Sequence, residues 1–442
     1  MSQATISRPL PPLAEPRHAE PPQVTDKTLP NGLRVMIVQR SAVPLVEVRL
    51  RVPFAGTSDE LPIATLLGET MLSGTSTHTD VTLAAALQAL GGGLGASVDA
   101  DRLLLAGNTL ATGLPGFLEL LSTVVTDAQY PDPQVAVERE HLADHIEVAL
   151  SQSSTAARAA LVKRLYGDHP YAVELPTPAQ VREVAAEQLR ALHASKVLPA
   201  GSTLILVGDV EAEETVRLAE TVFAGWATSG VASEMPPIPA LVTGPTLLVN
   251  REGSVQSSIR YAFESIRRTD PDYPALQLAN LIFAGYFSSR LVSNIREDKG
   301  YTYSAHSSIE HSVAGSVLTM DADVASEVTA QSLLEIDYEL GRLATSGPTA
   351  EEVEDVRQYA IGTLALSIAT QSGLASTLSA LVGIGLGPDW LEAHPQRLAE
   401  VTVEQVAQAA AKYLTPANAI RVVLGDADAI RSAVSVLAPI QE

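Results

Sequence analysis

The sequence predicts an α+β fold made of two homologous domains, each a largely antiparallel sheet backed by helices. Two observations lead to this prediction. The chain has 442 residues, which is too many for one hydrophobic core. The two halves also repeat, with strands first and helices after them in each half. Three pairs recur at one spacing of 217 positions: Glu183 and Glu400, Pro199 and Pro416, and Gly208 and Gly425.

Periodic apolar residues place the elements of the first half. Strands are expected at residues 28–38 and 45–52, joined as a hairpin through residues 40–44. A third strand is expected at the alternating residues 94–105, and a buried strand at the apolar run 203–207. The helices are expected at residues 62–74, 81–90, 113–125, 133–150, 156–165, 177–193 and 211–223.

A segment rich in Gly, Ser and Pro, residues 227–243, has no periodicity and is typical of a linker. The predicted boundaries are a Pro-rich extended arm (1–26), a first domain (27–228), a linker (229–243) and a second domain (244–442). In the second domain, strands are expected at 246–249, 257–263, 316–322 and 419–424, and helices at 274–285, 326–345, 350–364 and 401–413. The most apolar stretch, 364–386, is interrupted by polar residues, and we expect buried helices there, not a membrane span.

Composition excludes several classes of function. The formal net charge of −22 disfavours binding to nucleic acids or to anionic membranes, because both need clustered cations. It favours basic substrates or a basic partner. The chain has no cysteine, which excludes disulfides, thiolate metal sites and a Cys nucleophile. Residues 1–22 lack the apolar core of an intact signal peptide, and the sequence leaves the compartment open between cytoplasm and periplasm.

One segment, residues 288–304, is the strongest candidate for chemistry. Its first part has Leu291 and Ile295 on one helical stripe, and Lys299 and Gly300 form a typical helix end. A strand is expected after Gly300, with Tyr303 and Ala305 on the same face. A guanidinium at Arg296 and a phenol at Tyr303 would then converge on one point.

Several motifs together resemble one family. They are Leu-Pro-Asn-Gly-Leu at 29–33, Leu-Tyr-Gly-Asp-His-Pro-Tyr at 165–171, Val-Gly-Asp-Val at 207–210, Ser-Ser-Arg-Leu at 288–291 and Arg-Glu-Asp-Lys-Gly at 296–300. With the repeat, they resemble the pitrilysin, insulin-degrading enzyme and mitochondrial processing peptidase family of inverted zinc peptidases. The resemblance covers nearly all of the chain from about Thr28.

The resemblance implies that the zinc site of the first domain is missing. Active subunits of the family carry His-x-x-Glu-His on the first helix, where two His bind zinc and the Glu is the general base. The corresponding positions here are Thr65, Gly68 and Glu69, and the position of a later Glu ligand falls on His145. Because Thr and Gly offer no strong metal donors, we expect no cofactor in this chain.

The resemblance also assigns a role to Arg296 and Tyr303. In the family, an Arg and a Tyr seven residues apart reach from the second domain towards the scissile peptide, hold its carbonyl and stabilise the developing oxyanion. Some members divide the work between two chains. This chain then resembles the non-catalytic subunit of a heterodimer that acts in trans on unfolded peptides, with zinc in a homologous partner.

The same comparison implies a substrate-binding edge strand after the glycine run. Gly93, Gly95 and Ala96 stand at its start, and Gly95 takes the place of the usual Asn. Pairing through the backbone would survive this change, because it does not depend on the side chain.

Two other functions remain open from the sequence. The chain could be an autonomous metallopeptidase that uses His141, Asp144 and His145, which have the spacing His-x-x-Asp-His on a helix. It could also be a structural or assembly subunit on the same scaffold. His169, together with His306 and His311 near Tyr303, is explained by packing or by a polar strand face.

Overall fold

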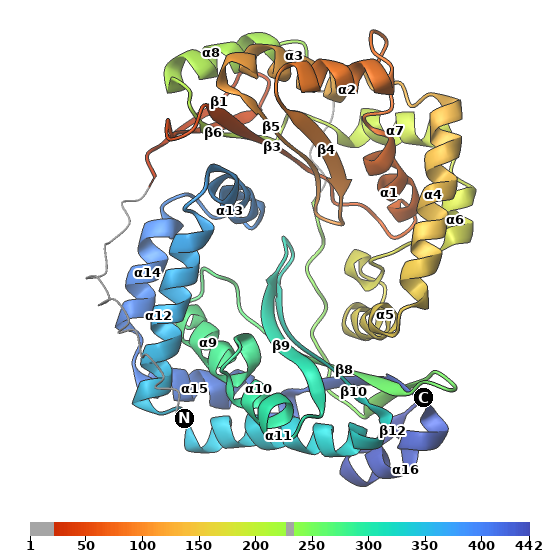
Figure 1. The fold of residues 1–442 in the computed structure, drawn as a ribbon, viewed down its shortest axis with the longest axis vertical. Coiled ribbons are helices and arrows are strands. Elements are labelled where there is room, and N and C mark those ends of the chain that lie inside the picture. The colour runs from red at the N-terminus through yellow and green to blue at the C-terminus, as the bar shows by residue number, and fades with distance from the viewer. Residues whose placement is uncertain (1–21, 227–233) are drawn as a thin grey trace, which may run out of the picture.

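The computed structural model describes residues 22–226 and 234–442, which form two domains with one six-stranded sheet each (Figure 1). The first sheet has the order β1 (Val24–Thr28), β2 (Arg34–Gln39), β6 (Thr203–Gly208), β3 (Leu45–Pro53), β5 (Arg102–Leu110), β4 (Gly93–Val98). The second has the order β12 (Ile440–Gln441), β7 (Thr246–Asn250), β11 (Ile420–Gly425), β8 (Gln256–Glu264), β10 (Ser316–Ala325), β9 (Thr302–His311). Strands β2, β6, β3, β5 and β4 of the first sheet correspond in order to β7, β11, β8, β10 and β9 of the second. The predicted α+β duplication is therefore confirmed.

Helices cover the outer face of each sheet and enclose a separate apolar core there. In the first domain they are α1 (Leu61–Thr70), α2 (Asp80–Ala89), α3 (Leu114–Asp127), α4 (Asp132–Ser151), α6 (Pro178–Arg182), α7 (Ala186–Lys196) and α8 (Ala212–Val222). In the second they are α9 (Tyr273–Asn280), α10 (Arg290–Val292), α11 (Thr329–Ser346), α12 (Ala350–Ser367), α14 (Trp390–Glu400), α15 (Val403–Tyr413) and α16 (Ala427–Leu437).

The predicted hairpin between β2 and β3 is wrong. β6 lies between them, parallel to β2 and antiparallel to β3. β6 is buried along its whole length, and such an apolar strand gains most from a neighbour on each side. Gly208 permits the close approach, because a Cβ there would lie 2.2 Å from the carbonyl oxygen of Leu45. The connection 40–44 can span the roughly 10 Å across one strand.

Four other boundaries differ from the sequence prediction. Residues 94–105 fall in two antiparallel strands, β4 and β5, because Asp99 turns the chain by accepting hydrogen bonds from the backbone of Asp101 and Arg102. β1 begins at Val24, within the predicted arm, and residues 1–21 of that arm lie outside the described residues. The predicted helix 177–193 is two helices, α6 and α7, and the helix that was expected to continue to Gly74 ends at Thr70.

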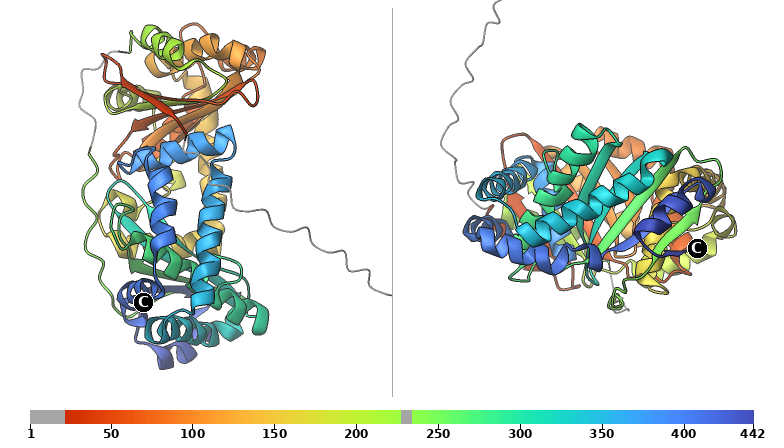
Figure 2. Two further views of the ribbon diagram at one scale, coloured as in Figure 1. Left: turned by 90° about the vertical axis from the view of Figure 1, so that its left-hand side faces the viewer. Right: turned by 90° about the horizontal axis from the view of Figure 1, so that it is seen from below.

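Each domain also supplies one helix to the inner face of the other domain's sheet. α5 (Ser153–Tyr166) of the first domain packs on the second sheet, where Leu161 and Leu165 belong to one apolar cluster with Val422. α13 (Gln371–Gly383) of the second domain packs on the first sheet, where Leu378 shares a cluster with Ile205. α13 lies across the first sheet in Figure 2, left. The two domains are therefore stabilised by each other.

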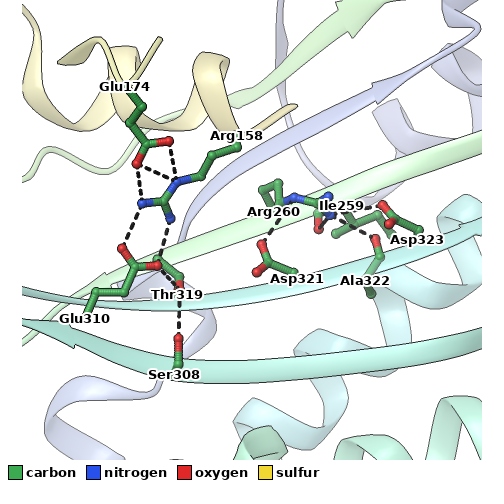
Figure 3. A network of polar contacts seen from close by, with 10 residues as sticks. All are labelled: Arg158, Glu174, Ile259, Arg260, Ser308, Glu310, Thr319, Asp321, Ala322 and Asp323. Atoms are coloured by element: carbon green, nitrogen blue, oxygen red, sulfur yellow. Dashed lines mark hydrogen bonds and ion pairs between the residues drawn. The ribbon is translucent and has the colours of Figure 1, made fainter. Parts of the chain in front are cut away.

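An ion pair reinforces the first of these contacts, and a hydrogen bond from an arginine reinforces the second. Arg158 of α5 donates to both carboxylate oxygens of Glu310 on β9, each at 2.8 Å, and also to Glu174 (Figure 3). Across the molecule, Arg49 of β3 donates to the hydroxyl of Ser372 on α13 at 3.0 Å. A bidentate Arg–carboxylate pair fixes orientation as well as distance, so these contacts set how the domains face each other.

The apolar stretch 364–386 forms the end of α12, a bend and α13. Within the described parts of the chain, no single helix is long and apolar enough to cross a membrane. Taken together, α12 and α13 have the length and apolar composition of a membrane span, but the angle between them is 109°.

An ion pair between Arg290 and Glu352 anchors the segment that carries Arg296. Arg290 donates to Glu352 at 2.6 and 2.7 Å and to the carbonyl of Gly347 at 3.0 Å. Burial opposes ionisation of Glu352, but the bonds from Arg290 and from the backbone of Thr349 outweigh it and lower the pKa of Glu352 to about 2. α10 is thereby fixed to the start of α12.

The reciprocal packing predicts the effect of Leu378→Ala. Leu378 is completely buried between the domains, so its truncation should lower the free energy of unfolding by about 2–5 kcal/mol. Denaturant unfolding followed by circular dichroism measures this. Leu366→Ala, on the exposed side of α12, is the matched control and should change the free energy by less than about 0.5 kcal/mol. Equal effects of the two substitutions would contradict the packing.

The Arg290–Glu352 pair predicts a pH effect on stability. The folded pKa of Glu352, about 2, lies below its value in an unfolded chain, about 4.3. Its stabilising contribution is therefore complete above about pH 4.3 and is lost as pH falls towards 2. The Tm difference between wild type and Glu352→Gln should shrink on acidification from pH 6 to about pH 2.5. Glu351→Gln, one residue away and exposed, is the control; a difference that does not change with pH would refute the assignment.

Candidate functional site

Arg296 lies on a helix of unusual geometry. After α10 the chain continues as a π-helix, η4 (Ser293–Asp298), which ends at Lys299 before Gly300 with a φ of +64°. The predicted helix and its glycine end are therefore present. A π-helix is wider than an α-helix and is frequent at functional sites. Here it turns Ile295 into the core and leaves Arg296 partly exposed.

A β-bulge at the start of β9 directs Tyr303. The pairing with β10 shifts by one residue between Ala305 and Thr302, and the Thr302 hydroxyl accepts a hydrogen bond from the backbone NH of Ser304. Ala305 is consequently buried, whereas Tyr303 is 88% exposed. The prediction that Tyr303 and Ala305 share a face is wrong, because a bulge re-aims the side chains of the strand.

The structure brings Arg296 and Tyr303 together. The guanidinium carbon of Arg296 lies 5.4 Å from the centre of the Tyr303 ring and 4.5 Å from that of Phe287. Both distances are within the range of cation–π attraction. Phe287 is 64% exposed. Sequence reasoning missed Phe287, although a large apolar residue just before the Ser-Ser-Arg-Leu motif was a usable signal.

This Arg–Tyr pair lies at the opposite end of β9 from the loop that contacts the first domain. The other end of β9 leads to a hairpin loop in which the backbone NH of Val313 donates to Asp101 and that of Ala314 to Tyr171, both in the first domain. Roughly ten residues of strand separate Tyr303 from Val313, a distance of about 30 Å. The pair is therefore about 30 Å along β9 from this contact.

The residues at the zinc-motif positions do not fit zinc. The Thr65 hydroxyl donates to the carbonyl of Leu61 in its own helix at 2.8 Å, and Glu69 is exposed. A Cβ at Gly68 would lie 3.3 Å from the backbone nitrogen and from a methyl group of Val98, so a side chain there would require β4 to shift by a few tenths of an ångström. Among residues 22–226 and 234–442, no group of three or more His, Cys, Asp or Glu could hold a metal ion.

The alternative motif on α4 has other contacts. His141, Asp144 and His145 are all exposed. Asp144 accepts a hydrogen bond from Arg182 at 3.0 Å, and the nearest carboxylate oxygen to His141 belongs to Glu138, at 3.8 Å. These side chains form an exposed helix surface with ion pairs, which is the ordinary arrangement for charged residues on a helix.

β4 is the terminal strand of the first sheet and pairs, within the described chain, with β5 alone. Its second edge is therefore available to an extended peptide. Gly93 and Gly95 are exposed, a Cβ at Gly93 would have open space around it, and Ala96 is half-buried. This is a geometry that permits strand addition through the backbone.

Of the three remaining histidines named in the sequence analysis, two pack within the fold and one is exposed. His169 accepts a hydrogen bond from the backbone of Tyr171, and its second nitrogen lies 2.9 Å from the carbonyl oxygen of Pro236. His306 is exposed. His311 lies 3.2 Å from the hydroxyl of Tyr273, and burial, with a contribution from nearby positive charge, lowers its pKa to about 3.

Two family models match the chain and together cover well over half of it. Residues 54–179 match the insulinase family, peptidase family M16, and residues 183–359 match the peptidase M16 inactive domain. An uncharacterised zinc protease of Mycobacterium leprae is 26% identical over 403 residues, 89% of this chain and 90% of that protein. The probable inactive metalloprotease YmfF of Bacillus subtilis is 26% identical over 314 residues, 64% of this chain and 71% of that one.

Solved structures agree with this assignment. The chain is similar to a peptidase M16 inactive domain from Pseudomonas fluorescens, with a TM-score of 0.83, 25% identity, and coverage of 91% of this chain and 98% of that one. It also shares the fold of the periplasmic protease PqqL from Escherichia coli, with a TM-score of 0.78 and 17% identity, and 96% of this chain matches 48% of that protease. The chain therefore belongs to the M16 family of peptidases, the pitrilysin family, as a member without the zinc motif.

Proposed function

We propose that this chain is the non-catalytic subunit of a heterodimeric zinc metallopeptidase. It closes the substrate chamber of a homologous zinc-bearing subunit and supplies Arg296 and Tyr303 to the peptide bound there. The observation that carries the proposal is the position of these two exposed donors. They lie together at the end of β9 opposite the loop that contacts the chain's own first domain, with Tyr303 88% exposed.

The chemistry of the pair suits an oxyanion. A guanidinium and a phenol both donate hydrogen bonds, and donors that are fixed before the reaction lower the barrier because they need no rearrangement when charge develops. Arg296 is held between the rings of Phe287 and Tyr303. The π-helix and the β-bulge fix the backbone on either side of the pair.

The size of the chain supports a two-chain arrangement. Because 96% of it matches 48% of PqqL, one chain of this kind is as large as half of that protease. A complete chamber of comparable size would then need a second chain. A homologue that keeps His-x-x-Glu-His is the partner that would complement the missing motif at Thr65, Gly68 and Glu69.

The substrate is proposed to be an unfolded peptide. The open edge of β4 at Gly93, Gly95 and Ala96 can add an extended strand. A net charge of −22 favours peptides with basic residues, because a field of one sign raises the local concentration of the opposite charge.

The isolated chain should bind far less than one zinc ion per molecule and should not cleave peptides, because its motif positions offer no set of strong donors. Metal analysis of the purified chain and a fluorogenic peptide assay measure this. A homologue with an intact motif, prepared in parallel, is the control and should retain its metal. Chelator-sensitive peptide hydrolysis by the pure chain would refute the proposal.

In the reconstituted pair, Tyr303→Phe and Arg296→Gln should each lower kcat about 10²–10³-fold, because each removes one donor to the oxyanion. Tyr303→Phe keeps the aromatic ring against Arg296 and removes the hydroxyl alone. Steady-state kinetics measure the effect, and gel filtration together with the zinc content of the pair checks that assembly is unchanged.

Tyr338→Phe, an exposed tyrosine on α11, is the matched control for this pair of substitutions and should leave kcat unchanged. If Arg296→Gln and Tyr303→Phe also left kcat unchanged while the pair remained active, the chain would be a structural or assembly subunit instead.

A further inference from the structure

A cavity of about 450 Å³ lies among four helices of the second domain, away from Arg296 and Tyr303. Its walls come from α9, α12, α13 and α14. Figure 2, left, shows α12 and α14 standing side by side, with α13 across their ends. Part of the wall is apolar, formed by Ala360, Leu364 and Ala380. Other residues of the lining have buried nitrogen atoms without a hydrogen-bond partner among the described residues.

Three side chains that line this cavity have buried nitrogens without a hydrogen-bond partner among the described residues. They are Nε of Arg268, Nε1 of Trp390 and Nδ1 of His394. His394 is 1% exposed and Trp390 8%. The other ring nitrogen of His394 is paired with Gln277 at 2.7 Å. Two of these nitrogens are donors, Nε of Arg268 and Nε1 of Trp390, whereas Nδ1 of His394 is an acceptor because Nε2–H donates to Gln277. An unpaired buried donor costs about 1–3 kcal/mol, so two of them at one cavity are a reason to look for a missing acceptor.

The charge around the cavity is positive in a strongly acidic chain. In the described parts of the chain, no carboxylate lies within 4.0 Å of Arg268 or Arg397. Arg397 donates to the carbonyl of Asp270 at 2.6 Å, which leaves its charge uncompensated. Burial, together with these two guanidinium groups, lowers the pKa of His394 to about 3, so the imidazole is neutral at physiological pH. Of the two guanidinium groups, that of Arg268 lines the cavity, and its charge is the one available to a ligand there.

The nitrogen groups are held in place by stacking. The guanidinium of Arg268 lies 5.0 Å from the centre of the Trp390 ring, and that ring is stacked on His394 at 4.2 Å with an angle of 14°. Such a stack leaves little freedom to Arg268, and a planar guanidinium fixed in this way is suited to a carboxylate, which it binds through two parallel hydrogen bonds.

We propose that this cavity binds a small organic carboxylate, with the carboxylate on Arg268 and Trp390 and the apolar part against Ala360, Leu364 and Ala380. The apolar wall favours an organic acid over an inorganic anion. The same chemistry is offered by a free organic acid and by the C-terminal carboxylate of a peptide. The proposal does not depend on the role of Arg296 and Tyr303.

The cavity is also connected to the contact between the domains. α13 forms one wall of the cavity through Ser376 and Thr377, and its Leu378 packs on the first sheet. A ligand that fills the cavity therefore adds contacts to the helix that joins the domains. Binding to the folded state alone raises its stability, so a bound carboxylate should also raise the Tm of the whole chain.

Tryptophan fluorescence tests the site directly. The chain has two tryptophans, and Trp226→Phe leaves Trp390 as the single reporter. Titration of this variant with butyrate and with N-acetyl-leucine, at constant ionic strength in chloride, should give a saturable change in emission with a Kd of about 10 mM or lower. N-acetyl-leucinamide, which has no charge, should give none. Tighter binding of N-acetyl-leucine than of butyrate would identify a peptide C-terminus as the preferred source.

Arg268→Gln should weaken this binding at least about tenfold by removing the guanidinium. Arg217→Gln, the same change on the exposed side of α8, is the matched control and should leave it intact. The Tm shift by butyrate, measured on the chain with both tryptophans, provides the same comparison if Trp226→Phe does not fold. Absence of saturation with both carboxylates, equal binding by sulfate, or unchanged binding in Arg268→Gln would each overturn the proposal.

Discussion

The reciprocal packing of α5 and α13 is the interaction on which the rest of the structure depends. Each sheet has one face on its own helices, and the other face is partly covered by a helix from the opposite domain. Without that helix, buried apolar residues such as Ile205 and Val422 would meet water. The two homologous domains therefore cannot separate without a large loss of hydrophobic contact, and the ends of their strands stay in a fixed relation.

That fixed relation decides where the candidate site can act. The hairpin of β9 and β10 contacts the first domain at its loop, through Asp101 and Tyr171. Tyr303 is at the opposite end of β9, where the bulge leaves it exposed. The degenerate motif at Thr65 and Gly68 is beside Val98, in the strand that precedes Asp101. The degenerate motif is therefore near the loop end of the β9–β10 hairpin and Tyr303 is at its other end, and the proposed function rests on this separation.

The duplication of the domains extends to a pair of buried arginines that the repeat in the sequence does not include. Arg49 and Arg260 occupy corresponding places in β3 and β8, and each donates to the carbonyl of the residue before it at 2.9 Å. Figure 3 shows that Arg260 also meets Asp321 and Asp323. A buried guanidinium is stable only when its donors are satisfied. In both domains the buried guanidinium donates the same hydrogen bond to the backbone, but its other partners are different acidic or hydroxyl side chains.

The sequence by itself determined the duplicated α+β fold and the position of most elements, because local periodicity and residue type carry that information. The loss of the zinc motif followed from the family that the sequence resembles, whose motif positions fall on Thr65, Gly68 and Glu69. The sequence also placed Arg296 and Tyr303 seven residues apart around a glycine turn. Tertiary structure decided the insertion of β6 between β2 and β3, the exchange of α5 and α13, and the exposure of Tyr303 by a bulge. Each of these depends on contacts between distant segments, such as Val324 with Thr302 or Leu378 with Ile205, and no local pattern in the sequence records such contacts.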